Sequence, residues 1–193
     1  MTADGVTGKA PDYPQTRLAM RTWQLDKAAL TVRSLNAPAG RKKSWMATAL
    51  ASPAGAWPHD QPITASCRLG GDKAHDDPVP GSECSCGIYA TTDLDIISNY
   101  LTRWSPVVGI VEMGGRVIPA TQGYRAAYAR VAVILLVDEA LTEPHSVLRD
   151  LADAYRVPAV VPHSASAEDY RELVGTPSLA LEAEQYLREM GNA

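Results

Sequence analysis

Residues 107–137 read VVGIVEMGGRVIPATQGYRAAYARVAVILLV, and the fold class follows from this stretch. Two runs rich in β-formers, 107–113 and 116–119, lie on either side of Gly114 and Gly115. A glycine pair between such runs predicts a hairpin turn, because the primed turns that join antiparallel strands need positive φ. Residues 131–137 are uniformly apolar, which predicts a central strand buried on both faces.

Downstream, the pattern predicts a strand–helix–strand unit. Pro144 suits the first turn of a helix, along which Leu148, Leu151 and Tyr155 share one face. Residues 158–161 then form a short apolar strand, so the segment from 124 to 161 predicts a parallel, right-handed crossover.

A last helix is predicted over residues 177–190. Its apolar stripe consists of Leu179, Ala183, Tyr186, Leu187 and Met190. We expect this stripe to dock on the chain's own sheet, because the preceding unit leaves a sheet face to cover. Docking on a partner protein is the alternative.

Upstream, short β-patterned segments predict further strands at residues 22–25, 30–35, 45–49, 63–67 and 86–90. Thr92, with Asp95 three residues later, predicts the start of a helix that Pro106 ends. The sequence therefore predicts an α+β fold. It combines a mixed β-sheet body, a cysteine/histidine loop and a C-terminal helical portion with a βαβ-like unit. Residues 1–20 lack periodicity and predict a flexible N-terminal arm, which leaves 21–193 as a single domain.

Composition narrows the class of protein. The chain has 193 residues, 46% of them hydrophobic, and a net charge of −4, which argues against a nucleic-acid partner. Its longest apolar run, 131–137, is far shorter than the roughly 20 residues of a membrane span, and residues 1–10 lack the apolar core of a signal peptide. We therefore expect a cytoplasmic protein without a membrane partner. The acidic C-terminal third is either a solvated surface or a face that meets a basic partner.

The best candidate site consists of Cys67, His75, Cys84 and Cys86. Three thiolates and one imidazole are a standard ligand set for structural zinc, and the two cysteines of Cys-Ser-Cys can reach one ion. The loop between residues 68 and 83 is too polar to pack a core, which favours a cross-link. The zinc hypothesis leaves two alternatives open: three reduced thiols, or a disulfide such as Cys67–Cys84.

Other residues offer weaker candidates. His59, Asp76 and Asp77 are substitutes for His75 as the fourth ligand. His145 and His163 lie beside predicted helix starts, where capping or solvation is the ordinary use. Arg125, beside the long apolar strand, is either a strand-end charge or the partner of a carboxylate or ligand anion.

The motif at residues 84–90 (CSCGIYA) belongs to a wider pattern that extends over residues 63–137. It follows residues 75–78 (HDDP) and precedes 108–111 (VGIV) and 123–126 (GYRA). This pattern resembles a group of small uncharacterised actinobacterial and actinophage proteins, although Met113 stands where an aromatic residue often precedes the glycine. The resemblance implies a phage accessory protein, such as a mycobacteriophage protein, that acts on a host protein. Such a protein inhibits a cell-growth or division factor, or excludes competing phage.

We therefore expect a non-enzymatic, zinc-binding protein-interaction module that binds a host protein. The second hypothesis is a zinc-stapled nucleic-acid-binding regulator that uses the basic residues 41–43. The third is a small enzyme that depends on cysteine and histidine. The oligomeric state does not follow from the sequence.

Overall fold

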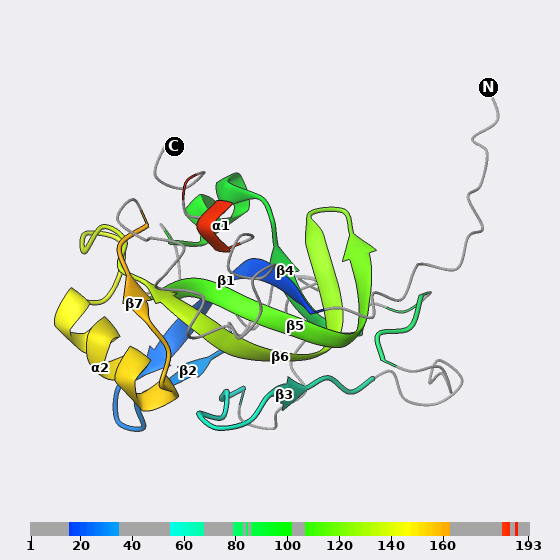
Figure 1. Ribbon diagram of the computed structural model, residues 1–193, viewed down its shortest axis with the longest axis horizontal. Helices are drawn as coiled ribbons and strands as arrows, with labels where there is room; N and C mark the ends of the chain where they lie inside the picture. Colours follow the sequence, from blue (N-terminus) through cyan, green and yellow to red (C-terminus); the bar gives the residue numbers. More distant parts are fainter. Residues whose placement is uncertain are drawn as a thin grey trace, which may run out of the picture.

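The computed structural model describes residues 16–34, 55–67, 79–82, 84, 86–101, 107–162, 183–185 and 188. Within them the chain has an α+β fold, as predicted, built on a seven-stranded mixed sheet (Figure 1). The strands are β1 (Arg17–Asp26), β2 (Thr31–Arg33), β3 (Ile63–Thr64), β4 (Ile88–Thr91), β5 (Val107–Ala120), β6 (Gly123–Leu135) and β7 (Ala159–Val160). Among the described residues, the helices whose ends are defined are α1 (Leu94–Leu101) and α2 (His145–Tyr155).

β5 and β6 form a long antiparallel ribbon, and the turn between them differs from the predicted one. Ala120 pairs with Gly123, so the chain reverses at Thr121 and Gln122. The prediction of a turn at Gly114 and Gly115 is therefore wrong.

Gly114 and Gly115 instead lie inside β5, where the pairing register shifts between Gly114 and Val117. Gly115 has φ of +69°, a conformation that favours glycine in a bulged strand. Gly114 lies opposite Tyr128, and a Cβ atom on Gly114 would approach the Tyr128 ring to 2.5 Å. The glycine pair thus makes a bulge over which the Tyr128 ring packs.

β6 is the central strand, as predicted, and both of its edges are used. One edge pairs with β5, and the other pairs in turn with β4, β3 and β7. β1 pairs with β5, and its Met20 also pairs with Thr91 of β4, so the sheet curls back on itself. β2 pairs with the far end of β1.

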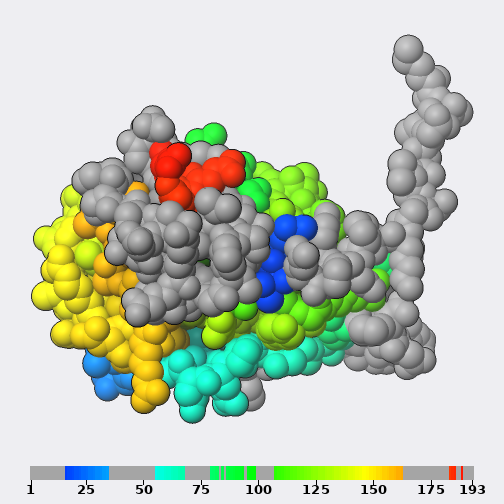
Figure 2. Space-filling model, viewed as in Figure 1, coloured from blue at the N-terminus to red at the C-terminus, as the bar shows by residue number. Residues whose placement is uncertain are grey.

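The curled sheet buries apolar side chains on both faces. One face packs Trp23, Val111 and Ile134 against Leu148 and Leu151 of α2. The other face packs Leu18 and Met20 of β1 with Ile97 of α1 and with Ala183. Residues 183–185 are helical, and their red atoms lie on the side of α1 in Figure 2. The docking expected of the last helix is thus seen at Ala183, while Leu179, Tyr186, Leu187 and Met190 lie outside the described residues.

The predicted crossover is present. β7 runs parallel to β6 after α2, and Leu148, Leu151 and Tyr155 are buried on the inner face of α2.

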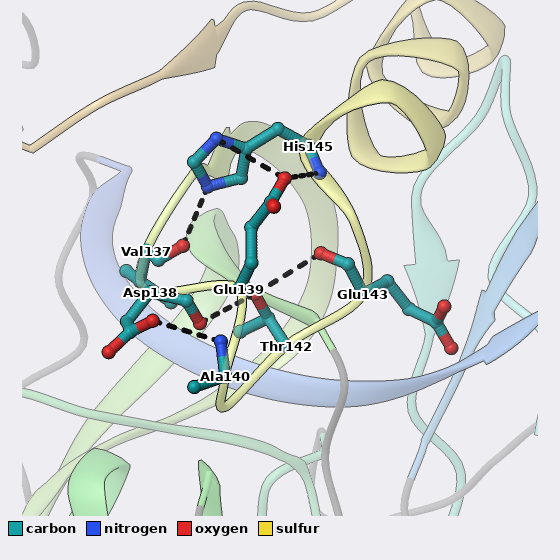
Figure 3. A network of polar contacts seen from close by, with 7 residues as sticks. All are labelled: Val137, Asp138, Glu139, Ala140, Thr142, Glu143 and His145. Atoms are coloured by element: carbon teal, nitrogen blue, oxygen red, sulfur yellow. Dashed lines mark hydrogen bonds and ion pairs between the residues drawn. The ribbon is translucent and has the colours of Figure 1, made fainter.

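Figure 3 shows the connection from β6 to α2. The Glu139 carboxylate accepts a hydrogen bond from the His145 backbone N–H at 2.6 Å, and so caps a helix that Pro144 leaves without a side-chain cap.

Several boundaries differ from the predicted ones. β1 begins at Arg17, so residues 17–20 belong to the sheet rather than to an N-terminal arm. The cap of α1 is Asp93 rather than Thr92, because the Asp93 carboxylate accepts the Asp95 N–H at 2.9 Å. β3 is shorter than the predicted strand at 63–67. Residues 1–15 and the strand predicted at 45–49 lie outside the described residues.

The bulge predicts unequal costs for two neighbouring substitutions. Gly114→Ala forces its Cβ into the Tyr128 ring, so we expect Tyr128→Ala to relieve most of the loss in the free energy of unfolding. Gly115→Ala brings a Cβ to 3.0 Å from both the Tyr128 ring and the Ala127 Cβ, but it also places a side chain at positive φ, so a backbone cost of about 1 kcal/mol should persist in the Tyr128→Ala background. Urea denaturation of the single and double variants measures both couplings. If Tyr128→Ala restored the same share of the lost free energy of unfolding at both positions, this account of the bulge would be contradicted.

The burial of Ala183 predicts a second pair of outcomes. Ala183 is fully buried and Gln185 is exposed. Ala183→Leu should lower the free energy of unfolding by about 1–3 kcal/mol through overpacking, whereas Gln185→Leu should change it by less than about 0.5 kcal/mol. Thermal denaturation of the two variants compares the same new side chain at both positions. Equal melting temperatures would show that this helix does not dock on the sheet.

Candidate metal centre

Three predicted ligands, Cys67, Cys84 and Cys86, lie together. All three sulfur atoms are within 4.8 Å of one another, and the Cys67 and Cys84 Sγ atoms are 3.5 Å apart. The topology explains this meeting, because β3 and β4 pair with neighbouring parts of the same edge of β6. Along β3 the pairing partner on β6 moves from Ala129 to Tyr128, so the chain approaches Ala126 on its way to Cys67. β4 starts two residues after Cys86, and its first residue, Ile88, pairs with Ala126.

Two of the sulfurs each accept a hydrogen bond from a backbone N–H. The Gly81 N–H donates to Cys86 Sγ at 3.2 Å, and the Cys86 N–H donates to Cys84 Sγ at 3.4 Å. Gly87 follows with φ of +118°, and a Cβ there would lie 2.9 Å from the Pro80 Cβ and 3.2 Å from the Arg125 Cβ. Position 87 therefore requires glycine to let the chain turn from the cysteines into β4.

Arg125 of β6 holds the cysteine loop from the other side. Its guanidinium donates to the backbone carbonyls of Cys84 and, at 3.2 Å, of Cys86. It also lies 5.8 Å from the centre of the Tyr89 ring, across the β4–β6 pair. Neither hypothesis for Arg125 drawn from the sequence included this role. This role depends on the pairing register, which places Arg125 opposite Tyr89, three residues after Cys86.

The electrostatics of the cluster would make metal binding depend on pH. Cys86 is only 3% exposed, and burial raises the pKa of its thiol to about 11, with the neighbouring Cys84 and Cys67 adding to the rise. Three thiolates at this separation repel one another unless a positive charge lies between them. Metal binding must therefore displace protons from the cluster, and its affinity should fall as the pH falls.

The sulfur positions suit one ion. A tetrahedral metal with thiolate bonds of about 2.3 Å separates its sulfurs by about 3.8 Å. The Sγ separations, 3.5 Å for Cys67 and Cys84 and at most 4.8 Å for the others, bracket this value. The cluster can thus hold a metal ion with three soft ligands. All three cysteines are free thiols in the structure, with no disulfide between them.

No fourth ligand is found among the described residues. No histidine or carboxylate within them joins the three thiols at a comparable distance. His59, one substitute, instead hydrogen-bonds the Leu30 carbonyl at 2.8 Å and packs edge-on against Tyr155. His75, Asp76 and Asp77 lie outside the described residues.

The remaining candidate residues do not join this centre. The His145 ring hydrogen-bonds the Val137 carbonyl at 2.7 Å, a contact with the preceding loop rather than the expected capping or solvation (Figure 3). His163 and the basic residues 41–43 lie outside the described residues.

Two further findings bear on the class of protein. None of the helices in the described ranges is long and apolar enough to cross a membrane. No protein-family model matches the chain, and comparison with curated proteins and with solved structures finds no match either.

The Arg125 clamp predicts an effect on metal affinity. Arg125→Gln removes the charged donor to two cysteine carbonyls, and loss of such a supporting contact typically weakens metal binding by about 10–100-fold. Competition titration with a chromogenic chelator measures the affinity. Arg130→Gln, on the same strand but paired with Glu112, is the matched control and should leave it unchanged. Equal metal affinities of both variants and the wild type would contradict this supporting role of Arg125.

Proposed function

We propose that this chain is a non-enzymatic protein-interaction module whose β-sheet body is stapled by a structural zinc ion. The ligands are Cys67, Cys84, Cys86 and His75, which lies outside the described residues. The observation that carries the proposal is the three-thiol cluster, in which the sulfurs lie within 4.8 Å of one another. Zinc is the favoured ion because thiolate-rich tetrahedral sets select it in structural sites.

The surroundings of the thiols support a structural role rather than a nucleophilic one. A catalytic cysteine needs an exposed thiolate and a neighbouring base. Cys86 is buried with a raised pKa, and within the described ranges no histidine joins the cluster. A metal at this point would connect the end of β3 to the start of β4, two strands that each pair with β6 and, among the described residues, do not pair with each other.

The interaction role rests on charge and on the resemblance. A net charge of −4 favours a protein partner over nucleic acid. The resemblance of the CSCGIYA pattern to actinobacterial and actinophage proteins supports an accessory protein that acts on an actinobacterial host protein, as an inhibitor of growth or division or in exclusion of competing phage. Three reduced thiols and a metal fit the reducing cytoplasm of such a host.

Elemental analysis should find one zinc per chain in protein purified without chelator. Structural zinc contributes on the order of 10 kcal/mol, so its removal should lower the melting temperature by at least about 10 °C. Cys86→Ser should melt at this lower temperature, and chelator should change it no further. Absence of metal from the wild type, or a chelator effect equal in both proteins, would contradict the staple.

Capture from actinobacterial lysate separates the partner classes. A tagged wild-type protein should retain a single host protein, and nuclease treatment should not release it. Release by nuclease would instead support the nucleic-acid-binding regulator.

A further inference from the structure

The three cysteines of the cluster differ in their exposure. Cys86 is only 3% exposed, and its Sγ accepts the Gly81 N–H at 3.2 Å. Cys67 and Cys84 are half-buried, so each of these two residues keeps part of its surface in contact with solvent. Oxidation of cysteine follows exposure as well as chemistry, so a small soluble oxidant should react with Cys67 and Cys84 before Cys86.

The two more exposed cysteines are also in contact with each other. Their Sγ atoms lie 3.5 Å apart. Closure to the roughly 2.05 Å of a disulfide bond needs a movement of about 1.5 Å. Cys67 lies three residues beyond the end of β3, and Cys84 lies four residues before the start of β4. This movement therefore falls outside both strands and need not break their pairing with β6.

A disulfide between Cys84 and Cys86 is less suited to the fold. A single residue separates these two cysteines, so the bond would close a small ring in which disulfide geometry is hard to reach. The Arg125 guanidinium also holds the backbone carbonyls of both residues. The same hydrogen bonds leave Cys67 on the opposite side of the cluster as the natural partner of Cys84.

We propose that Cys67 and Cys84 form a redox-active pair, which a hydroperoxide converts to a disulfide with release of the metal. The inference rests on the zinc centre proposed above and adds its regulation. The staple is closed under reducing conditions and is opened by peroxide.

The reaction balances with hydrogen peroxide as the oxidant. One thiolate attacks a peroxide oxygen, the O–O bond breaks, and the sulfur becomes a sulfenic acid while the departing hydroxide takes up a proton. The second thiolate attacks this sulfur, the S–O bond breaks, and another hydroxide leaves and is protonated. Two thiolates, one hydrogen peroxide and two protons thus give one disulfide and two molecules of water. Two electrons pass from sulfur to oxygen.

This oxidation removes two of the ligands on which the metal depends. The thiolate is the form of cysteine that binds metal, and a disulfide offers none. Cys86 and His75 would then remain as the only ligands of the proposed set, so we expect the ion to dissociate. Reduction of the disulfide regenerates both thiolates and restores the site.

Oxidation of the purified, zinc-loaded wild-type protein tests the switch. Hydrogen peroxide is added in small excess, released zinc is measured with a chromogenic chelator, and the cysteines are mapped by differential alkylation and mass spectrometry. We expect release of one zinc per chain, a disulfide between Cys67 and Cys84, and a reduced Cys86. Dithiothreitol followed by zinc should restore the metal content. An untreated sample corrects for zinc that the chelator removes by itself.

Serine variants assign the reaction to the pair. Cys86→Ser keeps both members, so peroxide should still join Cys67 to Cys84. Cys67→Ser lacks one member and should form no intramolecular disulfide at the same peroxide concentration. The mapping of the wild-type protein does not depend on how these variants fold.

A wild-type disulfide that includes Cys86, or release of zinc without any disulfide, would overturn the proposal. A chain that holds zinc and passes through the treatment unchanged would reject the switch and keep the zinc staple. A chain without zinc that still joins Cys67 to Cys84 and leaves Cys86 reduced would keep the redox-active pair and reject the staple.

Discussion

The pairing of β6 on both edges is the constraint on which the rest of the structure depends. β5 occupies one edge along nearly its whole length, and short strands from three distant parts of the chain occupy the other. None of these short strands is stable alone, since strands of two to four residues bury little and share few hydrogen bonds. Their positions are therefore set by β6, and so are the positions of the cysteines that flank β3 and β4.

The cysteine cluster shows how this constraint becomes chemistry. β6 brings Cys67 and Cys86 to one place, and its own Arg125 then fixes the carbonyls of the loop between Cys84 and β4. Gly87 allows the close passage past Arg125 that this arrangement needs. A metal at the thiols would add a covalent link where the sheet has only short ladders.

The sequence predicted those features that depend on local pattern. The apolar run at 131–137, the α2 stripe of Leu148, Leu151 and Tyr155, and the crossover to β7 are all present, because periodicity and the proline at a helix start are local signals. The three cysteines could be selected as ligands by residue type alone.

Features that depend on register could not be predicted. A glycine pair is compatible with a turn or with a bulge, and only the pairing of Tyr128 with Gly114 selects the bulge. The role of Arg125 follows from its place opposite Tyr89, and the meeting of the three cysteines follows from where β3 and β4 pair along β6. These are relations between distant segments, which hydrophobic pattern does not encode.

The most direct test of the account is X-ray absorption spectroscopy at the zinc K-edge of the purified protein. A centre formed by Cys67, Cys84 and Cys86 predicts three sulfur scatterers at about 2.3 Å and one nitrogen at about 2.0 Å. Cys86→Ser, which we expect to hold no zinc, should show no zinc edge. A shell of only nitrogen and oxygen, or no zinc edge at all, would contradict the assignment of these thiols to a metal centre.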